Sequence, residues 1–211
     1  ARTAQVGDVA VDTGFIVCNR RTYPLFIPLL EHLGVDLAPS DMSFAASFGG
    51  GALEFGTTTL RDMFAQPRLL ADPGHWRMIR DILRFFRQAP AHAEDAGSIS
   101  ALIDRLGLGS AFRDRFLMPI SGAIWSTPTR DMLDFPASSF VRFFDNHGLL
   151  TVNDQPEWLT VRGGSARYVE ALLRATKAEV RLSSPVQRIL RDGTGVMVVG
   201  PRGPERFDRV V

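Results

Sequence analysis

Apolar and small residues alternate between residues 42 and 48, which gives the clearest strand pattern in the chain. The apolar positions are Met42, Phe44, Ala46 and Phe48, and the small ones are Ser43, Ala45 and Ser47. A period of two is typical of a half-buried strand. Three glycines at positions 49–51 precede a second apolar run, so the segment predicts a β-hairpin near residues 42–55. The rings of Phe44 and Phe48 either fill a core or form the floor of a substrate pocket.

Residues 60–146 have the period of amphipathic helices, interrupted by prolines at which we expect the helices to break. These prolines are Pro67, Pro73, Pro90, Pro119, Pro128 and Pro136. The clearest helix is predicted over residues 74–88, where one half of the helical wheel is apolar. The apolar half holds Trp76, Met78, Ile79, Ile82, Leu83, Phe85 and Phe86.

The other half of this predicted helix carries four arginines, which we call the arginine stripe. They are Arg77, Arg80, Arg84 and Arg87. The arginine stripe is either a solvated helix face or a surface for an anionic ligand, such as a phospholipid headgroup or a membrane.

Shorter helices are predicted on both sides of this segment. One begins after a cap at Thr22 and ends at Gly34, and two more cover residues 98–106 and 110–117. Another ends at an Asn-His-Gly run, after which residues 149–152 are expected to re-enter a sheet. In that run, His147 is a candidate for acid-base catalysis, and the alternative is that it hydrogen bonds a carbonyl at the helix end.

The last fifty residues begin with an extended run that ends in two glycines. Gly163 and Gly164 precede a predicted helix over residues 166–176. Because glycine has no Cβ, the pair permits close approach of the backbone to a packed neighbour or to a ligand. Strand patterns follow at 179–182, 186–190, 196–199 and 205–211, and the glycine-rich turns between the last three predict a β-meander.

This C-terminal arrangement resembles the flavin-containing amine oxidases and phytoene desaturases. The matching features are the run Gly163-Gly164-Ser165, the segment 180–186, the glycine turns and residues 207–211. Residues 11–17 and 146–150 extend the resemblance to a bacterial branch of predicted NAD/FAD-binding oxidoreductases, and it covers nearly the whole chain. It implies an α+β fragment of an α/β family. The substrate domain would have a mixed or antiparallel sheet with a helical cap, and the FAD-binding domain would contribute the β-meander.

The resemblance also implies a division into three segments. Residues 1–20 would border the FAD domain, residues 21–158 would form the substrate domain, and residues 159–211 would return to the FAD domain. Relatives carry a GxGxxG turn before this region and a flavin-contacting segment after it, and the sequence contains neither. We therefore expect an internal fragment of a longer FAD-dependent enzyme. By itself, this fragment is expected to bind no FAD and to be inactive.

Positions that would contact FAD follow from the same resemblance. Arg2 and Thr3 would lie near the pyrophosphate, Gly14 and Phe15 near the flavin, and the backbone of Val186 near the adenine. The glycine pair Gly163 and Gly164 would support these FAD-contacting positions. In the substrate domain, Trp125 would face the cavity, and the alternative is that it packs in a core. Phe44 and Phe48 are the pocket residues expected from the strand pattern.

Composition narrows the alternatives. A net charge of +1 gives no excess of positive charge for nucleic acid, and a single cysteine with four scattered histidines provides neither a disulfide nor a metal site. No secretory leader or apolar run long enough to cross a bilayer is present, so we expect a soluble cytoplasmic protein.

The implied chemistry is hydride transfer from a small-molecule or lipid-like substrate to flavin, with no assigned catalytic residue. Amines, carotenoid-like polyenes and fatty acyl chains all stay open as substrates, and so do oxidase, desaturase and isomerase reactions. The alternative is a non-enzymatic module that docks anionic lipid or a partner protein through the arginine stripe.

Overall fold

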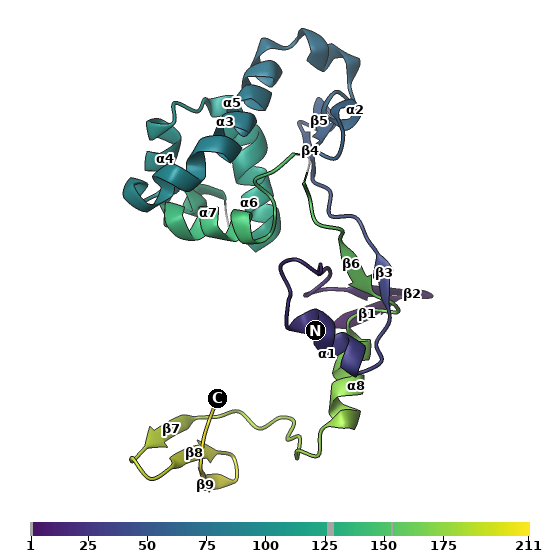
Figure 1. The fold of residues 1–211 in the computed structure, drawn as a ribbon, viewed down its shortest axis with the longest axis vertical. Coiled ribbons are helices and arrows are strands. Elements are labelled where there is room, and N and C mark those ends of the chain that lie inside the picture. Colours follow the sequence, from purple (N-terminus) through teal and green to yellow (C-terminus); the bar gives the residue numbers. More distant parts are fainter. Residues whose placement is uncertain (1, 126–128, 153) are drawn as a thin grey trace. The chain divides into compact units, whose positions relative to one another are not determined.

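The computed structural model describes residues 2–125, 129–152 and 154–211. The helix break predicted at Pro128 therefore lies outside the described residues. The described chain combines helices with small sheets whose strands pair antiparallel, which confirms the predicted α+β class (Figure 1). Contacts divide the chain into two compact units, residues 1–171 and 172–211. Each unit is described by itself.

The first unit begins with a tight hairpin of strands β1 (Thr3–Val6) and β2 (Val9–Asp12). Strand β3 (Leu37–Pro39) pairs with β6 (Leu159–Val161), which joins two segments that are far apart in the sequence. Between β2 and β3, helix α1 (Phe26–His32) starts later than predicted. The expected cap at Thr22 is wrong because the side chain of Asn19 accepts the backbone N–H of Thr22 and holds a separate turn there.

The predicted hairpin is formed by β4 (Ala45–Phe48) and β5 (Leu53–Gly56). Residues 42–48 alternate between partly buried and exposed, as the period of two required. On the second strand, Phe55 is buried in the main hydrophobic core. Helix α2 (Leu60–Met63) and the 3-10 turn η1 (Pro67–Ala71) then lead into the longest helix.

Helix α3 (Pro73–Ala96) has 24 residues and runs through Pro90, so the predicted break at this proline is wrong. Pro90 lies on the exposed side of the helix, where water can hydrogen bond the carbonyl that lacks an amide partner. The buried residues Phe85, Ala89 and Ala93 keep the same face against the core on both sides of it.

The remaining helices of the first unit pack with α3 around one core (Figure 1). They are α4 (Ile99–Arg105), α5 (Ser110–Phe112), the π-turn η2 (Arg113–Leu117), α6 (Met118–Trp125), the 3-10 turn η3 (Thr129–Asp134) and α7 (Ala137–Asn146). The predicted stop near Pro119 is wrong, because the wider π-turn before it accommodates a residue without an amide. The predicted strand at 149–152 is also absent, and Leu149 and Leu150 pack against the core instead.

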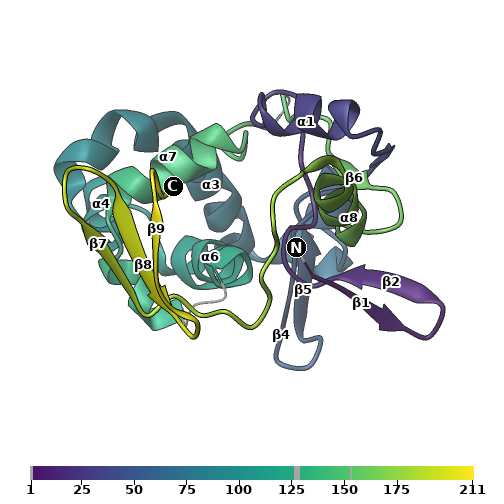
Figure 2. The same cartoon turned by 90° about the horizontal axis from the view of Figure 1, so that it is seen from below.

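Helix α8 (Ala166–Ala175) crosses the boundary between the units, and the second unit then forms the predicted meander (Figure 2). Its strands are β7 (Arg188–Arg191), β8 (Val196–Gly200) and β9 (Gly203–Phe207). Residues 179–182 do not form the predicted strand. In that segment, Arg181 forms ion pairs with Glu179 and Glu205. These side-chain contacts hold the segment in place of backbone hydrogen bonds to a neighbouring strand.

Candidate functional site

Five residues from three segments meet at the N-terminal end of α8, and we call this cluster the Asp12 junction. Its members are Thr3, Asp12, Phe15, Gly164 and Ser165. The Asp12 carboxylate accepts the backbone N–H of Ser165, with both oxygens at 2.9 Å, and the Thr3 hydroxyl at 2.5 Å. The Thr3 hydroxyl in turn accepts the N–H of Ala166 at 2.9 Å. The first free amides of α8 are therefore satisfied by residues from the chain's N-terminal hairpin.

The glycine pair in this junction makes close packing possible. Gly164 has a φ of +94°, and a Cβ at this position would lie 2.7 Å from Cγ2 of Thr3. The buried hydroxyl of Ser165 donates to the carbonyl of Phe15 at 2.8 Å. Of the two uses that the sequence left open for these glycines, Gly164 thus serves close approach to a packed neighbour.

The charge on Asp12 suits its position. Burial alone would raise the pKa of this carboxyl, but the hydrogen bonds from Thr3 and Ser165 outweigh it and lower the pKa below the ordinary value. A carboxylate at a helix N-terminus is further stabilised by the helix dipole. Since Asp12 already occupies this end of α8, a phosphate group could bind there only by displacing it.

A different part of the same layer is open to a ligand. Gly14 has no atom within 4 Å of the place where its Cβ would be, and its φ is outside the left-handed region. The backbone N–H groups of Gly14 and Phe15 donate to no acceptor within the described part of the chain. Arg2 is exposed, and its carbonyl holds the loop by accepting the N–H of Thr13 at 2.9 Å. The hydroxyl of Thr3, by contrast, is fully engaged.

The structure thus brings together most of the cofactor residues expected from the sequence. Arg2, Thr3, Gly14 and Phe15 share one loop-and-hairpin region, and Gly164 packs directly on it. Gly163 lies beside it, with a φ of +79°. Val186 belongs to the second unit, where it is exposed on the run before β7.

The sequence reasoning did not assign roles to Asp12 and Ser165, which carry most of the hydrogen bonds. Both residue types commonly cap helices, so the presence of Ser165 directly before a predicted helix was a local signal for such a role. The two residues are 153 positions apart, however, and nothing local indicates that they pair.

The expected substrate-pocket residues lie in aromatic clusters. Phe44 contacts Phe116 edge to face at 6.1 Å between ring centroids, and Phe48 packs against the same core. Trp125 packs among the aromatic side chains of α7, with its ring centroid 4.7 Å from that of Phe143 and the two rings tilted by 53°. All three side chains are partly buried, and whether a substrate reaches them stays a prediction.

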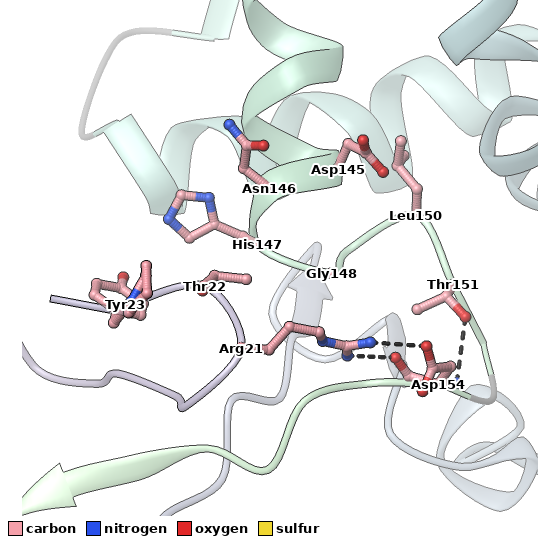
Figure 3. Close-up of a pocket in the computed structure, with 11 residues that line it drawn as sticks. Arg21, Thr22, Tyr23, Asp145, Asn146, His147, Gly148, Leu150, Thr151 and Asp154 are labelled. Atoms are coloured by element: carbon pink, nitrogen blue, oxygen red, sulfur yellow. Dashed lines mark hydrogen bonds and ion pairs between the residues drawn. The ribbon is translucent and has the colours of Figure 1, made fainter. Parts of the chain in front are cut away.

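A pocket of about 830 Å³ lies elsewhere in the first unit, between the loop at residues 21–24 and the end of α7 (Figure 3). Arg21 closes one side through an ion pair with Asp154 at 2.7 Å. His147 stacks on Phe143, with ring centroids 3.9 Å apart, and its Nδ1 lies 2.8 Å from the Phe143 carbonyl. That contact requires a proton on Nδ1, so His147 hydrogen bonds a carbonyl at the helix end, which is one of its two expected roles. Its ring also meets that of Tyr23 edge to face, with centroids 6.2 Å apart.

Within residues 2–125, 129–152 and 154–211, no group of three or more metal-ligating side chains comes together. Nor does any helix in this part of the chain have the length and apolarity to cross a bilayer.

A sequence profile of the family described as flavin containing amine oxidoreductase matches residues 1–211. A search of curated proteins found no match. Among solved structures, wild-type putrescine oxidase bound to putrescine has a TM-score of 0.69 to this chain at 17% identity, over 99% of this chain and 48% of that one. Cyclohexylamine oxidase from Brevibacterium oxydans IH-35A has a TM-score of 0.64 at 19% identity, over 98% and 48%.

A fatty acid isomerase from P. acnes, which produces CLA, has a TM-score of 0.66 at 13% identity, over 98% of this chain and 48% of that one. At these identities the likeness concerns the fold alone. The chain spans about half the length of each of these structures, 48% in all three.

Proposed function

This chain belongs to the flavin-containing amine oxidoreductase family, and from that premise we propose that it is the middle portion of an FAD-dependent oxidoreductase. The reaction we propose is removal of hydride from a small-molecule or lipid-like substrate. Residues outside the chain would supply the rest of the FAD domain, since the chain spans 48% of the structures it resembles. Family membership over residues 1–211 is the observation that carries this proposal.

The residues around the Asp12 junction fit a flat, polar cofactor. The open space at Gly14 admits the face or edge of a ring, and the N–H groups of Gly14 and Phe15 are donors without protein acceptors in the described chain. The exposed guanidinium of Arg2 suits a phosphate oxygen. We assign direct contact with FAD to these three residues, and a supporting role to Thr3, Gly163 and Gly164. For Val186 we propose contact with the adenine end through its backbone.

Bound FAD would supply the hydride acceptor, and the chain's own residues would position it and keep water away. The Asp12 junction is suited to positioning, because its hydrogen bonds fix the hairpin, the Gly14 loop and the start of α8 as one layer. Phe44, Phe48 and Trp125 offer apolar surface for a substrate once the cavity is complete.

Substrate class is the finer part of the proposal. The solved structures with this fold include proteins named for putrescine, for cyclohexylamine and for a fatty acid. All three classes therefore belong in the first test. Amines are the first choice because the family is described as amine oxidoreductases.

The test is anaerobic reduction of the protein produced from the complete reading frame. The purified protein is mixed with diamines, cyclic amines and unsaturated fatty acids in separate experiments, and the visible absorbance of oxidised flavin is followed. Loss of that absorbance with one class identifies the hydride donor. Purified protein without flavin, and without affinity for added FAD, would refute the proposal.

A further inference from the structure

The solvent-facing side of α3 combines exposed apolar side chains with arginines. Trp76, Arg80, Leu83 and Arg87 lie within about 60° of one another on the helical wheel, at 100° per residue. We call this set the α3 face. The buried residues of α3, including Met78, Ile82 and Phe85, point to the opposite side.

This arrangement differs from the one predicted from the sequence. Trp76 and Leu83 were expected on the apolar half of the helix, yet they are 49% and 50% exposed. Within the arginine stripe, Arg84 is partly buried and donates to the carbonyls of Leu106 and Gly107 at 3.3 Å each. Arg84 therefore caps the end of α4 and is not free for a ligand.

The acidic side chains near the α3 face are held by other groups. Residues 60–96 contain six arginines and five acidic residues, and of the latter Glu94 pairs with Arg142 at 3.1 Å and Asp95 with Arg105 at 4.0 Å. Asp81 is buried and accepts the N–H of Gly109 at 3.0 Å. Asp72 caps α3 and pairs with Arg115 at 3.0 Å, and Asp62 accepts the hydroxyl of Thr59 at 2.7 Å.

These acidic residues therefore leave the arginines of the α3 face without a close ion pair among the described residues. Arg80 has only a loose contact with the buried Asp81, at 3.7 Å, and its side chain is 65% exposed. Arg87 is exposed and forms no ion pair with any described residue.

The tryptophan of the α3 face is held in place. Its indole N–H donates to the carbonyl of Leu70 at 2.9 Å, and its ring packs against Phe64 with centroids 4.8 Å apart. Leu70 is itself 58% exposed, so apolar surface continues from the helix onto the preceding turn. Exposed apolar surface that is ordered rather than frayed is suited to contact with something outside the chain.

We propose that the α3 face is an interfacial docking surface for an anionic lipid bilayer. Indole and leucine side chains fit the boundary between headgroups and acyl chains, while guanidinium groups fit the lipid phosphates. The proposal is independent of the oxidoreductase function. A protein partner is less well suited, because a stable interface needs about 800 Å² from each side and the face is one arc of a single helix.

The test is flotation of the purified protein with phosphatidylcholine vesicles, with and without phosphatidylglycerol. We expect binding to the anionic vesicles only, and weaker binding at high salt. Replacing both arginines, Arg80→Gln with Arg87→Gln, should lower the partition coefficient roughly thirtyfold, or about fivefold for each arginine. Leu83→Ser should weaken binding to anionic vesicles without changing its salt dependence.

The matched control is Arg188→Gln with Arg191→Gln on β7, which changes the net charge equally at two exposed arginines outside the α3 face. Circular dichroism of every variant should be unchanged, since all these side chains are at the surface. An equal loss of binding in the control pair would overturn the proposal, because net charge alone would then explain flotation. Absence of flotation, or self-association that Leu83→Ser abolishes without vesicle binding, would also overturn it.

Discussion

Replacing Gly164 by alanine is expected to loosen the Asp12 junction through two separable effects. At a φ of +94°, an L-residue is strained by about 1–2 kcal/mol relative to glycine. The new methyl would also lie 2.7 Å from Cγ2 of Thr3. Overpacking of this kind costs about 1–3 kcal/mol. The sum predicts a loss of about 2–5 kcal/mol in the free energy of unfolding of the first unit.

The neighbouring glycine provides the matched control. Gly163 also has a positive φ, +79°, but the nearest atom to its added Cβ would be Nε of Arg167 at 3.4 Å, on a flexible side chain. Gly163→Ala should therefore cost only the backbone strain, about 1–2 kcal/mol. The gain from reducing the freedom of the unfolded chain is the same for both substitutions and cancels in the comparison.

A double-mutant cycle isolates the steric effect. Thr3→Ser removes Cγ2 and keeps the hydroxyl that bonds Asp12 and Ala166. Combined with Gly164→Ala, it should restore about 1–2 kcal/mol, while combined with Gly163→Ala it should restore nothing.

Urea unfolding followed by circular dichroism gives the free energies, and amide exchange at Ser165 and Ala166 reports the junction itself. Equal losses in Gly163→Ala and Gly164→Ala, or no rescue by Thr3→Ser, would refute the packing explanation.

Three further predictions concern single side chains. Asp12→Ala should cost about 0.5–2 kcal/mol in urea unfolding at neutral pH. Because the pKa of Asp12 is lowered on folding, the difference in free energy of unfolding between wild type and variant should be complete above the ordinary carboxyl pKa and decline as pH falls through the folded-state pKa. A difference that does not change with pH would contradict a capping role for the carboxylate. The thiol of Cys18 is fully buried and its pKa is raised by burial, so a thiol reagent should react slowly until urea is added; rapid reaction in buffer would contradict the packing. Phe144→Ala should cost about 3–5 kcal/mol because the ring is buried in the core, whereas Leu60→Ala, at 79% exposed, should leave the unfolding midpoint nearly unchanged; similar midpoints for the two would contradict the core assignment.

Local patterns in the sequence were enough for elements that depend on their own neighbours. The alternation at residues 42–48 led to a hairpin, and the serine and glycine around residues 98–107 led to helix α4 with its expected cap at Ser98. The glycine turns of the last segment likewise led to the meander. In each case the residues that specify the element lie within a few positions of it.

Predictions failed where packing from elsewhere overrides local preference. Pro90 does not end α3, because the buried residues on both sides of it keep the helix against the core. Trp76 and Leu83 match an apolar helix face, yet the core of the first unit is filled by other residues of α3. The segment 179–182 has a strand-like composition but lies beside no strand with which it pairs.

In the candidate site too, the decisive contacts join residues that are far apart in the sequence. The glycine pair predicted close approach correctly, but the atom that approaches Gly164 belongs to Thr3, more than 150 positions away. Local sequence contains no information about such a pairing. The family resemblance supplied the residues expected to contact a cofactor, while the hydrogen bonds of Asp12 and Ser165 became visible only in three dimensions.

The most direct test of whether the backbone at Gly14 faces the flavin is to compare the FAD affinity of the complete protein with that of its Gly14→Ala variant. Nothing lies within 4 Å of the added methyl in Gly14→Ala, so thermal unfolding without cofactor should be unchanged. If FAD lies against this backbone, a methyl in the contact should weaken binding roughly tenfold or more. Equal FAD affinity in the two proteins, or no FAD binding by either, would contradict the assignment of Gly14 to the cofactor site.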